Sequence, residues 1–110
     1  MYPSIEEVIK AIDSGIHPTS IGWSPLIRDL CVKILALGEK DVQVTDIKSK
    51  FGGLSFYIYG GSEAVDALIE AAESASTEIC EVCGKPGKLY LIGLYVTMCE
   101  EHYAEYREGK

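Results

Sequence analysis

Apolar residues recur at helical spacing in three stretches of the first 80 positions: 4–14, from Ser24 to a stop at Gly38, and 63–78. The first opens with the capping box Ser4-x-x-Glu7, and the second opens with Ser24-Pro25, serine at the cap and proline in the first turn. The three stripes expected to be buried are Ile5, Val8, Ile9 and Ile12; Leu26, Ile27, Leu30, Cys31, Ile34 and Leu35; and Val65, Leu68, Ile69, Ala72 and Ile79. The pattern predicts three helices, and the wide stripe of the second makes it the central one.

Between the second and third stretches the period changes to two, which predicts a β-hairpin over 42–59 with Gly52-Gly53 as a primed turn. The core-facing pairs expected from this register are Phe51 with Leu54, Ser49 with Phe56, and Ile47 with Ile58. The outer face is expected to hold Asp46, Lys48, Lys50, Ser55, Tyr57 and Tyr59. Val42 and Val44 also fall on that polar face, so either a bulge near Thr45-Asp46 resets the alternation or another element covers this end.

A second alternating stretch, Lys88 to Met98, predicts another hairpin that turns at Ile92-Gly93. The side chains expected to face inward are Leu89, Leu91, Leu94, Val96 and Met98. Those expected to face outward are Lys88, Tyr90, Tyr95 and Thr97. A short helix is expected to begin at Cys99.

Three cysteines and one histidine flank this second hairpin, as Cys80-x-x-Cys83 and Cys99-x-x-His102. A two-residue gap lets one tight turn aim two ligands at one point, and four such ligands complete a tetrahedral zinc site with no open position. The order of knuckle, hairpin and helix-borne ligand pair resembles the treble-clef zinc fold. We therefore expect an α+β fold in a single unit, with a body over 1–79 and a treble-clef-like module over 80–110 that holds a structural Zn²⁺.

Composition and charge limit the class of protein and the cellular compartment to expect. The chain has 110 residues and a net charge of −7, which argues against a protein whose main task is to coat nucleic acid. The first residues lack the basic and apolar regions of a signal peptide, and no apolar run is long enough to span a bilayer. We expect a cytoplasmic protein with no membrane association. In a reducing compartment the four cysteines are metal ligands or core residues, with disulfides as the alternative.

Candidate catalytic residues are few. Between Cys83 and Cys99 there is no His, Asp or Glu, so a nuclease of the HNH type, which also occurs on treble clefs, would lack its general base. Cys31 is read as a small buried hydrophobe, with a fifth ligand or redox thiol as the alternative. His17, in a loop before Pro18, is read as a surface or capping residue rather than a base. The sequence therefore predicts that the protein is not an enzyme.

The outer face of the first hairpin is the candidate partner surface. Its lysines and tyrosines, together with tyrosines of the second hairpin, form the set Lys48, Lys50, Tyr57, Tyr59, Tyr90 and Tyr95. Interleaved basic and aromatic side chains suit single-stranded nucleic acid, and exposed tyrosines equally suit a protein partner. An ordinary solvated sheet face has the same composition, so three interpretations stay open.

Four segments together resemble a family of small proteins from bacteriophages and prophages, over about residues 20 to 103. They are Gly22-Trp23-Ser24-Pro25-Leu26-Ile27, the hairpin segment from Lys48 to Tyr57 (KSKFGGLSFY), the knuckle from Cys80 to Gly87 (CEVCGKPG), and Cys99-x-x-His102. The family's hairpin usually reads KEKFGGLRFY, whereas this chain has Ser49 and Ser55 in place of the glutamate and the arginine. The expected register puts Ser55 opposite Lys50, and the missing arginine weakens the case for a basic groove.

The resemblance implies a phage setting rather than a particular activity. Phages carry many compact accessory proteins that bind and redirect host machinery, including defence systems. We therefore expect a zinc-stabilised accessory protein in the cytoplasm of a bacterial host, which binds a host or phage protein as an inhibitor or modulator. The alternative is a zinc-containing nucleic-acid-binding protein that uses the Lys/Tyr hairpin face, with Lys85, Lys88 and Tyr90. The sequence does not indicate an oligomeric state.

Overall fold

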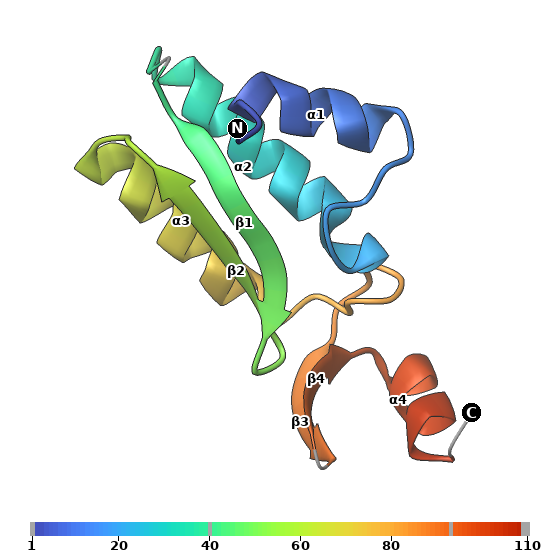
Figure 1. Cartoon of the computed structure of the whole chain (residues 1–110). Helices are drawn as coiled ribbons and strands as arrows, with labels where there is room; N and C mark the ends of the chain where they lie inside the picture. The colour runs from blue at the N-terminus through green and yellow to red at the C-terminus, as the bar shows by residue number, and fades with distance from the viewer. Residues whose placement is uncertain (1, 40, 93, 109–110) are drawn as a thin grey trace.

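The computed structural model describes residues 2–39, 41–92 and 94–108, and it shows a mixed α/β fold with two separate two-stranded sheets (Figure 1). The elements are α1 (Ile5–Asp13), the 3-10 turn η1 (Ile21–Trp23), α2 (Ser24–Ala36), β1 (Gln43–Lys50), β2 (Gly53–Tyr59), α3 (Glu63–Ser76), β3 (Lys88–Ile92), β4 (Leu94–Met98) and α4 (Glu100–Arg107). The three predicted body helices and the short helix after Cys99 are confirmed, whereas η1 was not predicted. Among the described residues no helix combines the length and the apolar character needed to cross a bilayer.

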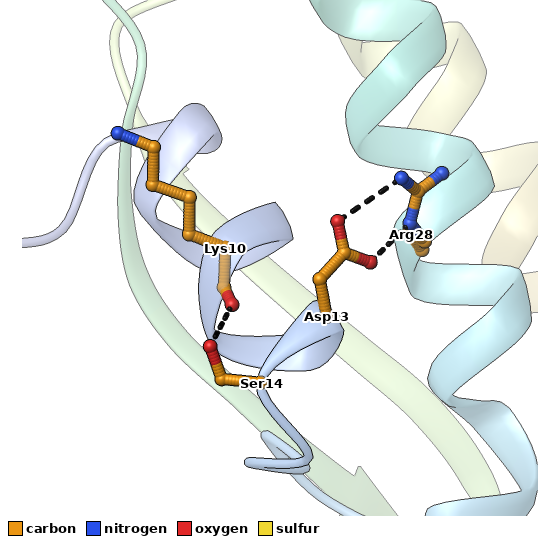
Figure 2. A network of polar contacts seen from close by, with 4 residues as sticks. All are labelled: Lys10, Asp13, Ser14 and Arg28. Atoms are coloured by element: carbon orange, nitrogen blue, oxygen red, sulfur yellow. Dashed lines mark hydrogen bonds and ion pairs between the residues drawn. The ribbon is translucent and has the colours of Figure 1, made fainter.

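The ends of the first two helices are fixed by polar contacts. The predicted capping box is present: the N–H of Glu7 donates to Ser4 Oγ at 3.2 Å, and the N–H of Ser4 donates to Glu7 Oε1 at 3.0 Å. Figure 2 shows Arg28 of α2 donating to both carboxylate oxygens of Asp13 at the end of α1, over 2.6 and 3.1 Å. Ser24 was predicted as the cap of α2 but lies inside the helix, where its hydroxyl is 2.7 Å from His17 Nδ1.

The first hairpin turns one residue earlier than the sequence predicted. Lys50 pairs with Gly53, so the turn is Phe51-Gly52, with φ of 52° and 79° at its two residues. Positive φ at both positions is typical of a type I′ turn, and at Phe51, which is not a glycine, this backbone conformation is strained. The predicted pairs, such as Phe51 with Leu54 and Lys50 with Ser55, are therefore wrong.

The sheet nevertheless keeps its predicted division into an apolar and a polar face, because the new pairs still join residues of the same predicted face, such as Ile47 with Phe56. A bulge between Val44 and Asp46 then shifts the register at the start of β1. This bulge is the first of the two explanations offered for the valines, and it puts Val42 and Val44 in the core. The helices lie on one side of the β1–β2 sheet and leave its other face bare (Figure 1). Phe51 was predicted to be in the core but is 73 % exposed at the turn.

The faces of the second hairpin differ from the prediction at several positions. Val96 and Met98 are buried as expected, but the inward-predicted residues Leu89, Leu91 and Leu94 are exposed, and Thr97, predicted outward, is fully buried. The reason is the register: Tyr90 pairs with Val96, so Tyr90 rather than Leu89 shares the face of Val96 and Met98. Helix α4 packs on this face, where Tyr90 stacks on Tyr103 with ring centroids 3.6 Å apart. Helix α4 itself contains no fully buried residue. The predicted turn at Ile92-Gly93 includes Gly93, which lies outside the described residues.

The second hairpin and the knuckle are joined to the rest of the protein by three hydrogen bonds between distant segments. The N–H of Gly22 donates to the carbonyl of Glu81, and Trp23 Nε1 donates to the carbonyl of Ile79, both over 2.9 Å. The Thr97 hydroxyl donates to the carbonyl of Gly52 over 2.5 Å. Because these bonds are buried or partly buried, they fix the position of the knuckle and hairpin relative to the helices.

Candidate metal centre

The four predicted ligands come from two local structures. Cys80 and Cys83 lie on a tight turn that follows α3, closed by the N–H of Gly84 donating to the carbonyl of Cys80 over 2.9 Å. Gly84 has a φ of 80°, which favours glycine, and this explains its place directly after the second cysteine. Cys99 is the N-cap of α4 and His102 lies in the first turn of that helix, so both side chains point to the same place.

The ligand atoms of these residues all lie within 4.8 Å of one another. The Sγ atoms of Cys83 and Cys99 are 3.7 Å apart, and His102 Nδ1 is 3.6 Å from Cys80 Sγ and 3.2 Å from Cys99 Sγ. A tetrahedral zinc ion with Zn–S bonds of about 2.3 Å requires sulfurs roughly 3.8 Å apart, whereas a disulfide requires about 2.05 Å. All four cysteines of the chain are free thiols. The spacing therefore fits a metal ion between the ligands and excludes a disulfide in this arrangement.

The protonation of the cluster also fits a cation. Burial works to raise the pKa of the Cys80 thiol, but hydrogen bonds from the backbone N–H groups of Cys99 and Cys83 outweigh it and lower this pKa to about 6. The backbone N–H of Lys85 works to lower the pKa of Cys83, but desolvation and the neighbouring thiols raise it overall. Hydrogen bonds to Cys80 and Cys99 raise the pKa of His102. The Cys80 thiolate thus forms readily, while Cys83 and His102 hold their protons more strongly, and a metal ion would displace those protons.

The other residues considered for chemistry lie apart from this cluster. Cys31 is fully buried in the core of the body, where burial raises the pKa of its thiol to about 12, so it is placed as a small hydrophobe. His17 is exposed and hydrogen-bonds to Ser24. Glu81, next to Cys80, accepts a hydrogen bond from the N–H of Thr97 over 3.2 Å.

The predicted partner residues do not all lie together. Lys48, Lys50, Tyr57 and Tyr59 lie on the bare face of the β1–β2 sheet, and Lys48 Nζ is 5.6 Å from the centre of the Tyr57 ring. Tyr95 joins them through Phe51, because Lys50 Nζ is 5.8 Å from the Phe51 ring and the Phe51 and Tyr95 rings meet edge to face at 6.3 Å. Tyr90 lies on the other side of the second hairpin, against α4. We name the continuous set the aromatic–lysine surface: Lys48, Lys50, Phe51, Tyr57, Tyr59 and Tyr95.

Sequence reasoning missed the residues that hold the metal-binding turn against the helices. Gly22 approaches the turn so closely that a Cβ there would collide with the carbonyl oxygen of Cys80 and lie 2.7 Å from the carbonyl carbon of Glu81. Trp23 was expected only to pack over the start of α2. The sequence offered one hint, since Gly22-Trp23 belongs to the same set of motifs as the two ligand pairs.

Comparisons with known proteins supply no relative for this site. No family model matches the chain, and neither a curated protein nor a solved structure matches it.

Proposed function

We propose that the protein is a small zinc-stabilised module, treble-clef-like in its metal-binding part, that acts by binding a protein partner through the aromatic–lysine surface. The observation that carries this proposal is the continuous exposed surface that spans both hairpins. Tyr59 is 71 % exposed and Phe51 is 73 % exposed, at opposite ends of β2. Large aromatic side chains are enriched where proteins meet partners, and Tyr57 and Tyr59 lie on the face of the β1–β2 sheet that the helices leave bare (Figure 1).

The zinc assignment is supported by the donor set and its spacing. Three thiolates and one imidazole are soft or borderline ligands, which favour zinc over magnesium or calcium. Four protein ligands leave no open position for a substrate or a reactive water, so the ion's role is structural and the protein is not proposed to be an enzyme. Metal analysis of the purified protein should find about one zinc per chain, and a Cys83→Ser variant should lose it.

A protein partner is favoured over nucleic acid on grounds of charge. The chain carries a net charge of −7, and one of the two lysines of the surface, Lys48, lies 3.7 Å from the carboxylate of Asp46. That ion pair reduces the positive charge that would face a phosphate backbone. The aromatic rings would contribute to the binding of a protein or of a nucleic acid. The aromatic–lysine surface, however, carries little net positive charge to attract a phosphate backbone.

Site-specific photocrosslinking tests the proposal even while the partner is unidentified. A photoreactive phenylalanine analogue is placed at Tyr59, and in a control at Ile16, which is 64 % exposed and lies on the loop after α1. In producing cells the Tyr59 probe should form one discrete protein adduct that the Ile16 probe does not form. A Tyr57→Ala change in the same chain should weaken that adduct. Equal labelling from both positions would refute the surface assignment.

Single-stranded nucleic acid is the second candidate, and the alternation of Lys48 and Lys50 with Tyr57 and Phe51 is the observation that favours it. It predicts an affinity for oligonucleotides that falls steeply with salt. A gel shift at low salt that is abolished by Lys50→Ala would support it, and free oligonucleotide under the same conditions would eliminate it.

The biological setting is proposed from the phage resemblance. A small binding module whose four metal ligands leave no open position for a substrate is suited to block or redirect another protein, and a host factor, such as a component of a defence system, is the proposed target. Host cells that produce the protein should then lose the activity of that factor, and the Tyr57→Ala variant should restore it.

A further inference from the structure

We propose that the outer edge of β3 is a self-association site, at which a second copy of this chain pairs antiparallel with the first through the backbone of Leu89 and Leu91. The β3–β4 hairpin of each copy would then contribute two strands to one continuous four-stranded sheet. This inference goes beyond the proposed function, because it uses a strand edge and leaves Tyr57 and Tyr59 open.

The other strand edges are closed at least in part by contacts within the protein. On β2, the N–H groups of Leu54 and Phe56 donate to Ser76 Oγ and Glu73 Oε2 of α3, over 2.8 and 2.9 Å. On β4, Thr97 exchanges hydrogen bonds with Glu81, whose N–H donates to the Thr97 carbonyl over 2.9 Å. Closed edges prevent pairing with other chains.

The edge of β1 is protected in a different way. Its first residues pair with the segment before α1, where the N–H of Val44 donates to the carbonyl of Pro3 over 2.9 Å. Its later residues carry the exposed charges of Asp46, Lys48 and Lys50. Charged side chains along an edge discourage the approach of another strand.

Beyond the exposed Lys88 at its start, the edge of β3 lacks both kinds of protection. The segment after α3 pairs along this edge only as far as Gly87, whose N–H donates to the carbonyl of Glu78 over 2.9 Å. Leu89 and Leu91 are the next residues whose backbone groups point the same way, since backbone direction alternates along a strand. Among the described residues no hydrogen bond from outside the hairpin reaches either of them. Their side chains are 46 % and 64 % exposed.

A second copy fits this edge for reasons of symmetry and charge. An antiparallel strand pair has a two-fold axis perpendicular to the sheet, so one edge is complementary to itself. With the axis at Tyr90, the Leu89 backbone of each copy donates to and accepts from the Leu91 backbone of the other. Although the chain is acidic overall, the stretch 82–98 contains two lysines and no Asp or Glu, so two copies meet here without carboxylate repulsion.

The size of the contact sets the strength to expect. Leu89 and Leu91 together expose roughly 200 Å² per copy, so even with the backbone the dimer buries well under the ~1,200 Å² of a stable interface. The dimer should therefore be weak, mostly dissociated at about 10 µM and substantially formed near 1 mM.

Sedimentation equilibrium of the purified full chain tests this directly. The apparent mass should rise with concentration from 12.0 kDa toward twice that value. Leu91→Lys should raise the dissociation constant at least ten-fold, whereas Leu94→Lys should leave it unchanged. Leu94 is the matched control because it is 67 % exposed and lies on β4 of the same hairpin. Circular dichroism and metal content confirm that both variants fold.

Amide hydrogen exchange supplies the backbone evidence. The amides of Leu89 and Leu91 should exchange more slowly at high concentration than at low, while those of Lys48 and Lys50 on β1 should not change. A protein that stays monomeric near 1 mM, or a Leu91→Lys variant that associates as the parent does, would overturn the proposal. Protection of these amides by an added extended peptide, in a protein that stays monomeric, would also overturn it and assign the edge to a foreign strand.

Discussion

The contact between Gly22 and the metal-binding turn predicts that Gly22→Ala is strongly destabilising. The added Cβ would collide with the carbonyl oxygen of Cys80 and lie 2.7 Å from Glu81 C and 2.8 Å from Gly84 N. These are backbone atoms of the turn that presents two ligands, so they cannot move aside as a flexible side chain could. Position 22 does not have a positive φ, so the cost is steric rather than conformational.

The magnitude follows from two contributions. Forcing one extra methyl group into a closely packed site costs about 1–3 kcal/mol. The added methyl group also pushes Gly22 away from the turn that carries Cys80, and this weakens the 2.9 Å hydrogen bond from the N–H of Gly22 to the carbonyl of Glu81. A hydrogen bond of this kind contributes about 1 kcal/mol to stability. The expected loss is about 2–4 kcal/mol, a large fraction of the 5–15 kcal/mol that stabilises a typical domain.

Urea unfolding followed by fluorescence measures this loss, because Trp23 is the single tryptophan of the chain and is fully buried beside the contact. With a slope of about 1–3 kcal/mol per molar urea, the midpoint should fall by at least ~0.7 M. Gly53→Ala is the matched control, since a Cβ there would lie 3.3 Å from the Thr77 methyl group, which can adjust. It should cost less than about 1 kcal/mol. Equal midpoints for the parent and Gly22→Ala would refute the steric reasoning.

Three further predictions concern the metal cluster, the core thiol and the junction between the two hairpins. Zinc affinity, measured by competition with a chromophoric chelator, should fall steeply as the pH is lowered from about 7.5 to 5.5. Protons compete with the metal for Cys80, whose pKa is lowered to about 6, and for His102, whose pKa is raised by its thiol partners. An affinity independent of pH would contradict this. Burial raises the pKa of the Cys31 thiol to about 12, so this thiol should not react with a thiol reagent at pH 8 in the native protein. It should react once the chain is unfolded. Rapid labelling of Cys31 in the native protein, mapped by mass spectrometry, would show instead that the thiol is accessible. Thr97→Val should lower the free energy of unfolding, measured in urea, by about 1–2 kcal/mol. The variant keeps the shape of the side chain but leaves the buried carbonyl of Gly52 without its donor. An unchanged midpoint would mean that this hydrogen bond makes no net contribution to stability.

The helices and the ligand cluster could be predicted because local chemistry specifies them. The capping box Ser4-x-x-Glu7 marks the start of α1, and the spacing of Cys80 and Cys83 permits few arrangements other than a metal-binding turn. In both cases the residues that decide the structure are neighbours in sequence. Local patterns of this kind do not depend on the rest of the fold.

The register of the first hairpin could not be predicted in this way. Phe51-Gly52 and Gly52-Gly53 are both acceptable two-residue turns, and the second requires less strain. The structure adopts the first, in which Gly52 reaches Thr97 and packs so closely on Leu89 and Tyr95 that a side chain would not fit. These partners lie about 40 residues further along the chain, so the choice depends on tertiary contacts that sequence patterns do not contain. The faces of β3 were also assigned wrongly because of its register: Tyr90 pairs with Val96, and α4 covers the face that these two residues share.

Helix α4 contains no fully buried residue, and it contacts the rest of the protein through the Cys/His cluster and a small apolar cluster with its tyrosines. With zinc bound as proposed, loss of the ion would release this helix and loosen the turn that carries Cys80, while the body would keep its packed interior. Under zinc limitation the released segment would become the first target of proteases. The supply of zinc in the cell would then set the lifetime of the protein as well as its shape.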